Sequence, residues 1–100
     1  MTDIPQRAQV VVIGGGAIGT SIAYHLTKLG ITDVVLLERK ELTSGTTWHA
    51  AGLITSAGMP TETFLWMSRY TTELLPKLTE ETGQDTGFRT IGHLHIASTP

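Results

Sequence analysis

Residues 10–19 of this chain read VVVIGGGAIG, and this stretch decides the fold. The apolar β-branched run Val10 to Ile13 is typical of a parallel strand buried on both faces. It leads directly into Gly14, Gly16 and Gly19, which form the pattern G-x-G-x-x-G. That pattern is informative when a strand precedes it and a helix follows it, because this context is characteristic of a dinucleotide-binding unit.

The residues after the glycines complete the context. Apolar residues recur at helical spacing from Ala17 to Leu29, and Gly30 stands where a helix C-terminal glycine is expected. A second strand-like run, Asp33 to Leu37, ends at Glu38, nineteen positions after the last motif glycine. The sequence therefore predicts an α/β fold that begins with a Rossmann-like βαβ unit. A complete fold of this type has five or six strands, so we expect this unit to be incomplete and the chain to be the N-terminal part of a longer protein.

Each glycine of the motif has a separate physical role. Gly14 permits the tight turn, Gly16 lets a pyrophosphate approach the backbone, and Gly19 allows close packing of helix on strand. Unpaired amides at the start of the helix, together with its dipole, favour binding of phosphate. We therefore expect the first turn, including Ala17 and Ile18, to hold a pyrophosphate.

Glu38 is predicted to accept hydrogen bonds from the adenosine ribose hydroxyls. A carboxylate at this position repels a 2′-phosphate, which argues against NADP. NAD and FAD both contain ADP, so the motif alone leaves both open.

The second half of the chain is predicted to contain a loop, a helix and a strand. Residues 40–60 show no regular period, apart from a short helical turn predicted over Trp48 to Leu53, and a connection of this length is often functional. A helix is predicted from Thr61, its N-cap, to Thr82, with Gly83 as its stop and Pro76 kinking or dividing it. The alternation in TGFRTIGHLHIAS, residues 86–98, predicts a strand. We expect residues 1–60 to belong to the nucleotide-binding domain and 61–100 to lead into a substrate domain.

Composition excludes several classes of function. The net charge is -2 and the sequence has no basic stripe, so no nucleic-acid partner is expected. There is no cysteine, which excludes disulfides and thiolate metal sites, and His93 and His95 lack a third metal ligand. No signal peptide or apolar span of about 20 residues is present, so we expect no membrane association and a cytoplasmic location, or the mitochondrial matrix in a eukaryote.

From Val10 onward the chain resembles the D-amino-acid-oxidase-like family of FAD-dependent oxidoreductases, especially its dimethylglycine and sarcosine dehydrogenase branch. The resemblance rests on VVVIGGGAIGTSIAYHLTKLG, VVLLERKELTSGTTWHAAGLI and ETGQDTGFRTIGHLHIA. The middle segment is the most specific, because NAD dehydrogenases have nothing similar after the acidic residue. The resemblance implies that FAD is the cofactor. It places Arg39 beside the adenine or ribose, and the loop that wraps the flavin side at Gly45, Thr46, Thr47, Gly52 and Leu53.

In that branch, the histidine of the T-W-H-A-A-G motif is bonded covalently to the flavin, and the matching residue here is His49. The alternative is a histidine that hydrogen-bonds near the cofactor. The implied activity is oxidation of a secondary or tertiary amine of the N-methylglycine type by hydride transfer to flavin. An electron-transfer flavoprotein or oxygen would accept the electrons, and a folate-binding region often follows in this branch.

Two other functions remain open. An NAD-dependent dehydrogenase would leave the 44–53 loop unexplained, and a regulatory relative of the same fold would not need turnover. The catalytic residues and the residues that bind the substrate carboxylate are expected beyond Pro100. We therefore expect the 100-residue chain alone to be inactive.

Overall fold

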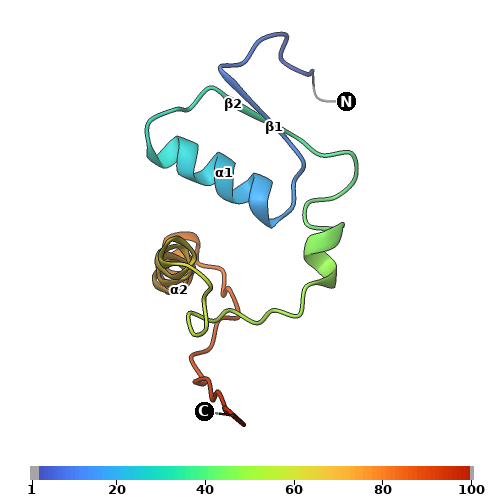
Figure 1. Ribbon diagram of the computed structural model, residues 1–100. Helices are drawn as coiled ribbons and strands as arrows, with labels where there is room; N and C mark the ends of the chain where they lie inside the picture. The colour runs from blue at the N-terminus through green and yellow to red at the C-terminus, as the bar shows by residue number, and fades with distance from the viewer. Residues whose placement is uncertain (1–2, 100) are drawn as a thin grey trace. The chain divides into compact units, whose positions relative to one another are not determined.

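The elements of the chain follow a β-α-β order and continue into a second helix. The computed structural model describes residues 3–99, and Figure 1 shows the strands and helices along them. The chain divides into two compact units, Met1–Ala51 and Gly52–Pro100. The predicted α/β fold with a βαβ unit is confirmed. In chain order the elements are β1 (Val10–Ile13), α1 (Ala17–Lys28), β2 (Val34–Leu37), the 3₁₀ turn η1 (Thr46–His49) and α2 (Glu62–Thr82).

The two strands of the first unit are parallel neighbours in one sheet. Their register pairs Val10 with Val34 and continues to Ile13 with Leu37. Helix α1 packs on one face of this sheet, where Val12 is buried with 8% of its surface exposed. Successive strand residues point to opposite faces, so Val11 and Ile13 lie on the other face, where they are 51% and 86% exposed. Only one face of the sheet is covered within residues 3–99, whereas the sequence predicted two.

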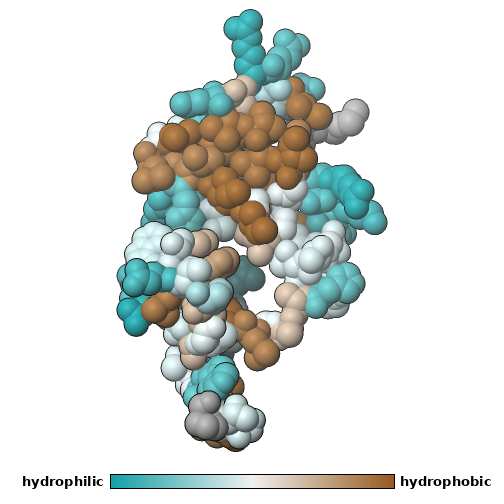
Figure 2. Space-filling model, viewed as in Figure 1, coloured by the Kyte–Doolittle hydropathy of each residue, from teal (hydrophilic) through white to brown (hydrophobic). Residues whose placement is uncertain are grey.

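Hydrophobic residues gather over this first unit. Figure 2 shows the brown, apolar surface over β1, β2 and α1. Helix α1 contributes to it, because Ile18 is 78% exposed and Leu29 is 79% exposed. A βαβ unit therefore leaves much apolar surface in contact with solvent among the described residues.

Helix α1 ends in a complete Schellman motif. Gly30 has a left-handed backbone with φ of 88°, and its amide donates to the Thr27 carbonyl at 3.0 Å. The Ile31 amide donates to the Leu26 carbonyl at 2.9 Å. These are the two hydrogen bonds that define the motif, and only glycine adopts the required conformation at low cost. The predicted helix end at Gly30 is confirmed.

The helical turn in the 40–60 loop lies earlier than predicted. It was expected over Trp48 to Leu53, but η1 begins after Gly45, whose carbonyl accepts from the Trp48 amide at 3.2 Å. Ala50 has φ of -70° and ψ of 143°, an extended conformation that ends the turn. The small residues that made the sequence ambiguous permit the turn at either place, and the backbone bonds select the earlier one.

Helix α2 forms the main element of the second unit. Its N-cap is Thr61, as predicted, because the threonine hydroxyl accepts from the Phe64 amide at 3.3 Å. Its C-cap is Gly83, with φ of 72°. The helix continues unbroken through Pro76, so the alternative of two separate segments is wrong. Proline removes one donor, and the turns on both sides keep their own hydrogen bonds. Among residues 3–99, no helix is both long and apolar enough to cross a membrane.

The segment after α2 is not the predicted strand. None of residues 84–99 is assigned to a strand, and the apolar residues Ile91, Leu94 and Ile96 are 81–90% exposed. A strand is stabilised by hydrogen bonds to a neighbouring strand. The described part of the chain supplies no such neighbour for this segment.

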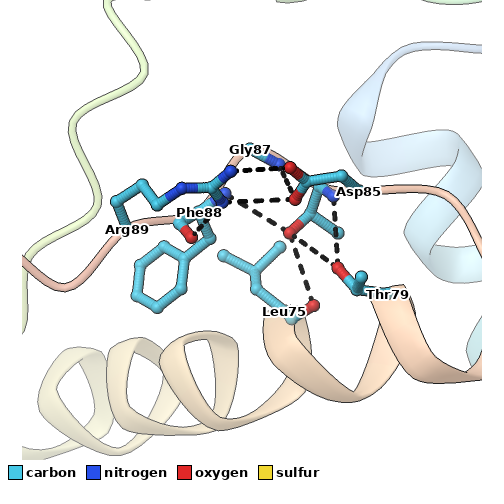
Figure 3. A network of polar contacts seen from close by, with 7 residues as sticks. Leu75, Thr79, Asp85, Gly87, Phe88 and Arg89 are labelled. Carbon is cyan, nitrogen blue, oxygen red and sulfur yellow. Dashed lines mark hydrogen bonds and ion pairs between the residues drawn. The ribbon is translucent and has the colours of Figure 1, made fainter.

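The first residues of this segment fold back on the end of α2. The Asp85 carboxylate accepts hydrogen bonds from the Gly87 amide at 2.9 Å and from both terminal nitrogens of Arg89, at 3.2 and 2.7 Å. The Thr86 amide donates to the Thr79 hydroxyl on α2 at 3.2 Å. Figure 3 shows these contacts converging above the helix. We call residues 85–89, with Thr79, the Asp85 clasp.

We expect the Asp85 clasp to open in acid. Hydrogen bonding to Arg89, and then to the Gly87 amide, lowers the pKa of Asp85 from 3.8 to about 2. A depressed carboxyl pKa stabilises the folded state fully above about 3.8, and this contribution is lost as the pH falls through about 2. The chemical shift of the Gly87 amide proton, followed by NMR from about pH 6 to about 1.5, should show this transition. Asp85→Asn should abolish it, and a Gly87 midpoint near 4 in the parent would contradict the clasp.

Gly19 should be intolerant of a side chain. A Cβ atom at this position would lie 1.8 Å from the Gly14 carbonyl oxygen. Gly19→Ala should therefore force α1 away from β1 and lower the free energy of unfolding by about 1–3 kcal/mol or more, measured by urea titration. Gly45→Ala is the matched control, because Gly45 has φ of -92° and no atom within 4 Å of its Cβ position. Equal stability of the two variants would refute close packing at Gly19.

Candidate functional site

The glycine turn between β1 and α1 brings backbone groups close together. Gly14 has φ of 107°, a conformation that L side chains rarely adopt, and its amide donates to the Leu37 carbonyl of β2 at 2.8 Å. Helix α1 begins three residues later and packs against the turn at Gly19. The tight turn and close packing that the motif predicted are therefore both present.

The Glu38 carboxylate ties the glycine turn to the end of β2. One carboxylate oxygen accepts from the Gly15 amide at 2.8 Å, and the other accepts from the Lys40 amide at 2.9 Å. The hydrogen bond from Gly15, followed by the one from Lys40, lowers the pKa of Glu38 below its usual 4.5. Each carboxylate oxygen has a second lone pair. Glu38 can therefore brace the turn and still accept hydrogen bonds from a ligand.

Gly15 is a site residue that sequence reasoning missed. A Cβ atom there would lie 2.5 Å from Leu42 Cδ2 and 3.1 Å from Glu38 Cβ. The Gly15 carbonyl also accepts from the Thr43 amide at 2.9 Å. This glycine falls at a variable position of G-x-G-x-x-G. The signal that could have identified it is the run of three consecutive glycines.

The N-terminus of α1 offers backbone donors. The Ala17 amide donates to the Thr47 hydroxyl at 2.9 Å. Within residues 3–99, the amides of Ile18 and Gly19 have no hydrogen-bond acceptor. Free amides at a helix N-terminus, where the helix dipole is positive, favour an anion.

A cavity of about 520 Å³ lies at this helix terminus. Its volume is within the range of about 300–1,000 Å³ that is typical of small-molecule and cofactor sites. The predicted site residues that line it are Gly14, Gly16, Ala17, Ile18, Gly19, Glu38, Arg39, Gly45, Thr46 and Thr47. Sequence reasoning did not identify the other lining residues, which are Val12, Ile13, Ile22, Lys40, Thr43 and Ser44. Thr43 and Ser44 adjoin the segment already singled out, whereas the apolar residues were assigned only to packing.

The remaining predicted residues lie outside the cavity lining. His49 belongs to η1, and Gly52 and Leu53 belong to the second unit. The His49 Nδ1 atom lies 2.9 Å from the Gly45 carbonyl oxygen. Because a carbonyl only accepts, Nδ1 must carry the proton, and the neutral ring then has its lone pair on Nε2.

No third possible metal ligand accompanies the two histidines near the C-terminal end of the described residues. His93 and His95 stack with ring centroids 6.3 Å apart, and His93 Nδ1 lies 3.3 Å from the Thr55 hydroxyl. Across residues 3–99, no group of three possible metal ligands is found.

Comparison with known proteins identifies relatives of the whole chain. The DAO family, described as "FAD dependent oxidoreductase", matches residues 9–100. Human mitochondrial dimethylglycine dehydrogenase is 50% identical over 101 residues, covering 99% of this chain and 11% of that protein. Mouse mitochondrial sarcosine dehydrogenase is 48% identical over 96 residues, covering 95% and 10%. The mouse mitochondrial pyruvate dehydrogenase phosphatase regulatory subunit is 42% identical over 96 residues, covering 96% and 11%. The chain therefore spans about a tenth of the length of these relatives.

The residues that line the cavity fit the ADP part of FAD, the cofactor named in the description of the matching family. Gly16 has no side chain, so a ligand can approach the backbone at the start of α1. Two amides there have no hydrogen-bond acceptor in the described residues. The Glu38 carboxylate can accept further hydrogen bonds beside those from the turn. Arg39 and Lys40 add positive charge to the lining. An anionic nucleotide would therefore meet free amide donors at the start of α1 and, after β2, two cations beside a carboxylate that can accept from its hydroxyls.

Replacing Glu38 should loosen the glycine turn and weaken nucleotide binding. Glu38→Gln leaves only one acceptor oxygen, so either the Gly15 or the Lys40 amide loses its partner. Because hydrogen bonds to charged groups are strong, FAD affinity of the full-length protein should fall about tenfold or more, measured by fluorescence titration. Glu41→Gln is the control, since no side-chain hydrogen bond is formed by Glu41 in the described residues. An unchanged affinity in Glu38→Gln would contradict this role.

Proposed function

We propose, because this chain belongs to the DAO family of FAD dependent oxidoreductases, that its protein oxidises a secondary or tertiary amine of the N-methylglycine type. The observation that carries the proposal is the near 50% identity, along nearly the whole chain, to enzymes named for dimethylglycine and sarcosine. The T-T-W-H-A-A-G segment of the loop lies within these matches. Bound FAD would accept a hydride from the carbon next to the amine nitrogen.

The first unit would contribute the ADP-binding part of the protein. The free amides of Ile18 and Gly19 would hold the pyrophosphate, and Glu38 would accept from the ribose hydroxyls while remaining bonded to the turn. Arg39 would lie beside the adenine or ribose, because it lines the same cavity. Three residues of the loop after β2 also line that cavity, namely Gly45, Thr46 and Thr47. This supports their assignment to cofactor binding.

His49 would be the point of covalent attachment of the flavin. Its Nδ1 hydrogen bond to the Gly45 carbonyl leaves Nε2 as the nucleophilic atom. The imidazole would supply the nucleophile at Nε2 and give up its Nδ1 proton, and bound FAD would supply the two-electron oxidising capacity that forming the new C–N bond requires. The Gly45 carbonyl would stabilise the positive charge that develops on the imidazole. Oxygen or another electron acceptor would then reoxidise the flavin.

Several parts of the proposal concern the longer protein. Electrons would pass to an electron-transfer flavoprotein or to oxygen, and residues 61–100 would lead into a substrate domain that binds the amine. The location would be the cytoplasm, or the mitochondrial matrix in a eukaryote; the second alternative is supported by two relatives that are named as mitochondrial.

A non-catalytic regulatory role is the second candidate. It is favoured by the 42% identity to the pyruvate dehydrogenase phosphatase regulatory subunit. The two functions differ in turnover. Addition of dimethylglycine or sarcosine to the anaerobic holoprotein should bleach the flavin absorbance if the protein is an amine dehydrogenase. A yellow protein that neither substrate bleaches would favour the regulatory role, and a colourless protein that takes up no FAD would contradict both and favour an NAD enzyme.

Digestion of the denatured holoprotein with trypsin should locate the attachment. The peptide from Glu41 to Arg69 contains His49 and no internal lysine or arginine. We expect this peptide to carry the mass and fluorescence of the flavin, and His49→Ala to release FAD on denaturation. Recovery of the unmodified peptide from a fully flavinylated preparation would refute the attachment and leave noncovalent FAD binding intact.

A further inference from the structure

The turn that carries His49 is held internally by hydrogen bonds to two backbone carbonyl groups. The Gly45 carbonyl oxygen accepts from the Trp48 amide at 3.2 Å and from His49 Nδ1 at 2.9 Å. The Ala50 amide closes the turn on the Thr47 carbonyl at 3.2 Å. These bonds make η1 a single short unit, so a shift at one of its residues moves the imidazole with it.

Only one hydrogen bond in the described residues fastens η1 to another element. It runs from the Ala17 amide, the first amide of α1, to the Thr47 hydroxyl oxygen at 2.9 Å. The same oxygen would lie 2.9 Å from a Cβ atom on Gly16. Thr47 therefore lies directly against the glycine turn, and its contact requires a bare backbone there.

The bond between the Ala17 amide and the Thr47 hydroxyl fixes the distance between the N-terminus of α1 and the turn that carries His49. The Ala17 amide adjoins the free amides of Ile18 and Gly19, which are the candidate pyrophosphate donors. The hydroxyl thus joins the donors for one end of the cofactor to the turn that bears His49. The Thr47 oxygen accepts from Ala17 while its hydrogen stays available to donate, so the fastening persists whether or not a phosphate is nearby.

We propose that Thr47 is a positioning residue, which holds His49 at a fixed separation from the α1 N-terminus and thereby controls how fast His49 bonds to the flavin. This inference rests on the proposed function. A nucleophile must approach its target within about 3–3.5 Å, and a displacement of about 1 Å can slow the reaction about 100-fold. The affinity for FAD depends mainly on the free amides of α1 and on Glu38, so it should respond less than the attachment rate does.

The test compares attachment with binding in the full-length protein. Apoprotein is mixed with FAD, and covalent flavin is followed over time by fluorescence of denatured samples. Thr47→Val keeps the shape but removes the acceptor, so attachment should slow about tenfold or more. Thr47→Ser keeps the hydroxyl and should restore the rate. In the His49→Ala background, which binds only noncovalently, Thr47→Val should weaken FAD binding by a clearly smaller factor than it slows attachment, because the α1 amides and Glu38 remain to hold the cofactor.

Thr27→Val is the matched control. It also removes one side-chain hydrogen bond of α1, from the Thr27 hydroxyl to the Tyr24 carbonyl at 2.7 Å, but at the other end of the helix. Its attachment rate should equal that of the parent. An unchanged rate in Thr47→Val would overturn the proposal, as would an FAD affinity that falls by the same factor as the rate. Covalent flavin in His49→Ala alone would instead refute the proposed attachment at His49.

A second measurement covers a Thr47→Val protein that fails to fold. Hydrogen exchange of the Ala17 amide in the parent and in Thr47→Ser should be slow, because the hydroxyl protects it. Exchange as fast as that of an exposed loop amide would show that the bond is absent in solution and would overturn the proposal.

Discussion

The rest of the site depends on the hydrogen bond that the Glu38 carboxylate accepts from the Gly15 amide. The carboxylate stands at the end of β2, and Gly15 lies in the turn after β1, so the ends of two parallel strands are joined by a side chain. The packing of Gly15 against Glu38 and Leu42 leaves no room for a side chain at that glycine. The turn, the start of α1 and the loop after β2 are consequently held in one arrangement, with the cavity between them.

The loop after β2 adds a second level to this arrangement. The Thr43 amide bonds to the Gly15 carbonyl, and the Thr47 hydroxyl bonds to the Ala17 amide, so the loop follows the glycine turn closely. The loop that was expected to wrap the flavin side is therefore attached to the glycine turn and to α1 at two points. This attachment explains how His49, which is not part of the cavity lining, is presented by a turn whose first two residues, Thr46 and Thr47, line the cavity.

The elements that sequence predicted well are those with local causes. The β-branched run of β1, the Schellman glycine Gly30 and the N-cap Thr61 act within a few residues, and all three appear as expected. The predicted strand over residues 86–98 depends instead on a partner strand, which the described residues do not supply. The division at Pro76 also failed, since the neighbouring helical turns outweigh one missing donor. Much of the candidate site was predictable, because G-x-G-x-x-G and the acidic residue are read from spacing alone.

The sequence by itself determined the family, the βαβ order, the three motif glycines, and the acidic residue Glu38, because each depends on local chemistry at fixed spacing. Tertiary structure decided what these groups contact. It engaged Glu38 with Gly15, placed the Thr47 hydroxyl on the first amide of α1, and bonded His49 Nδ1 to the Gly45 carbonyl. The first two of these contacts join residues 23 and 30 positions apart. Their partners are chosen by the folded path of the backbone, which no local pattern of residues specifies.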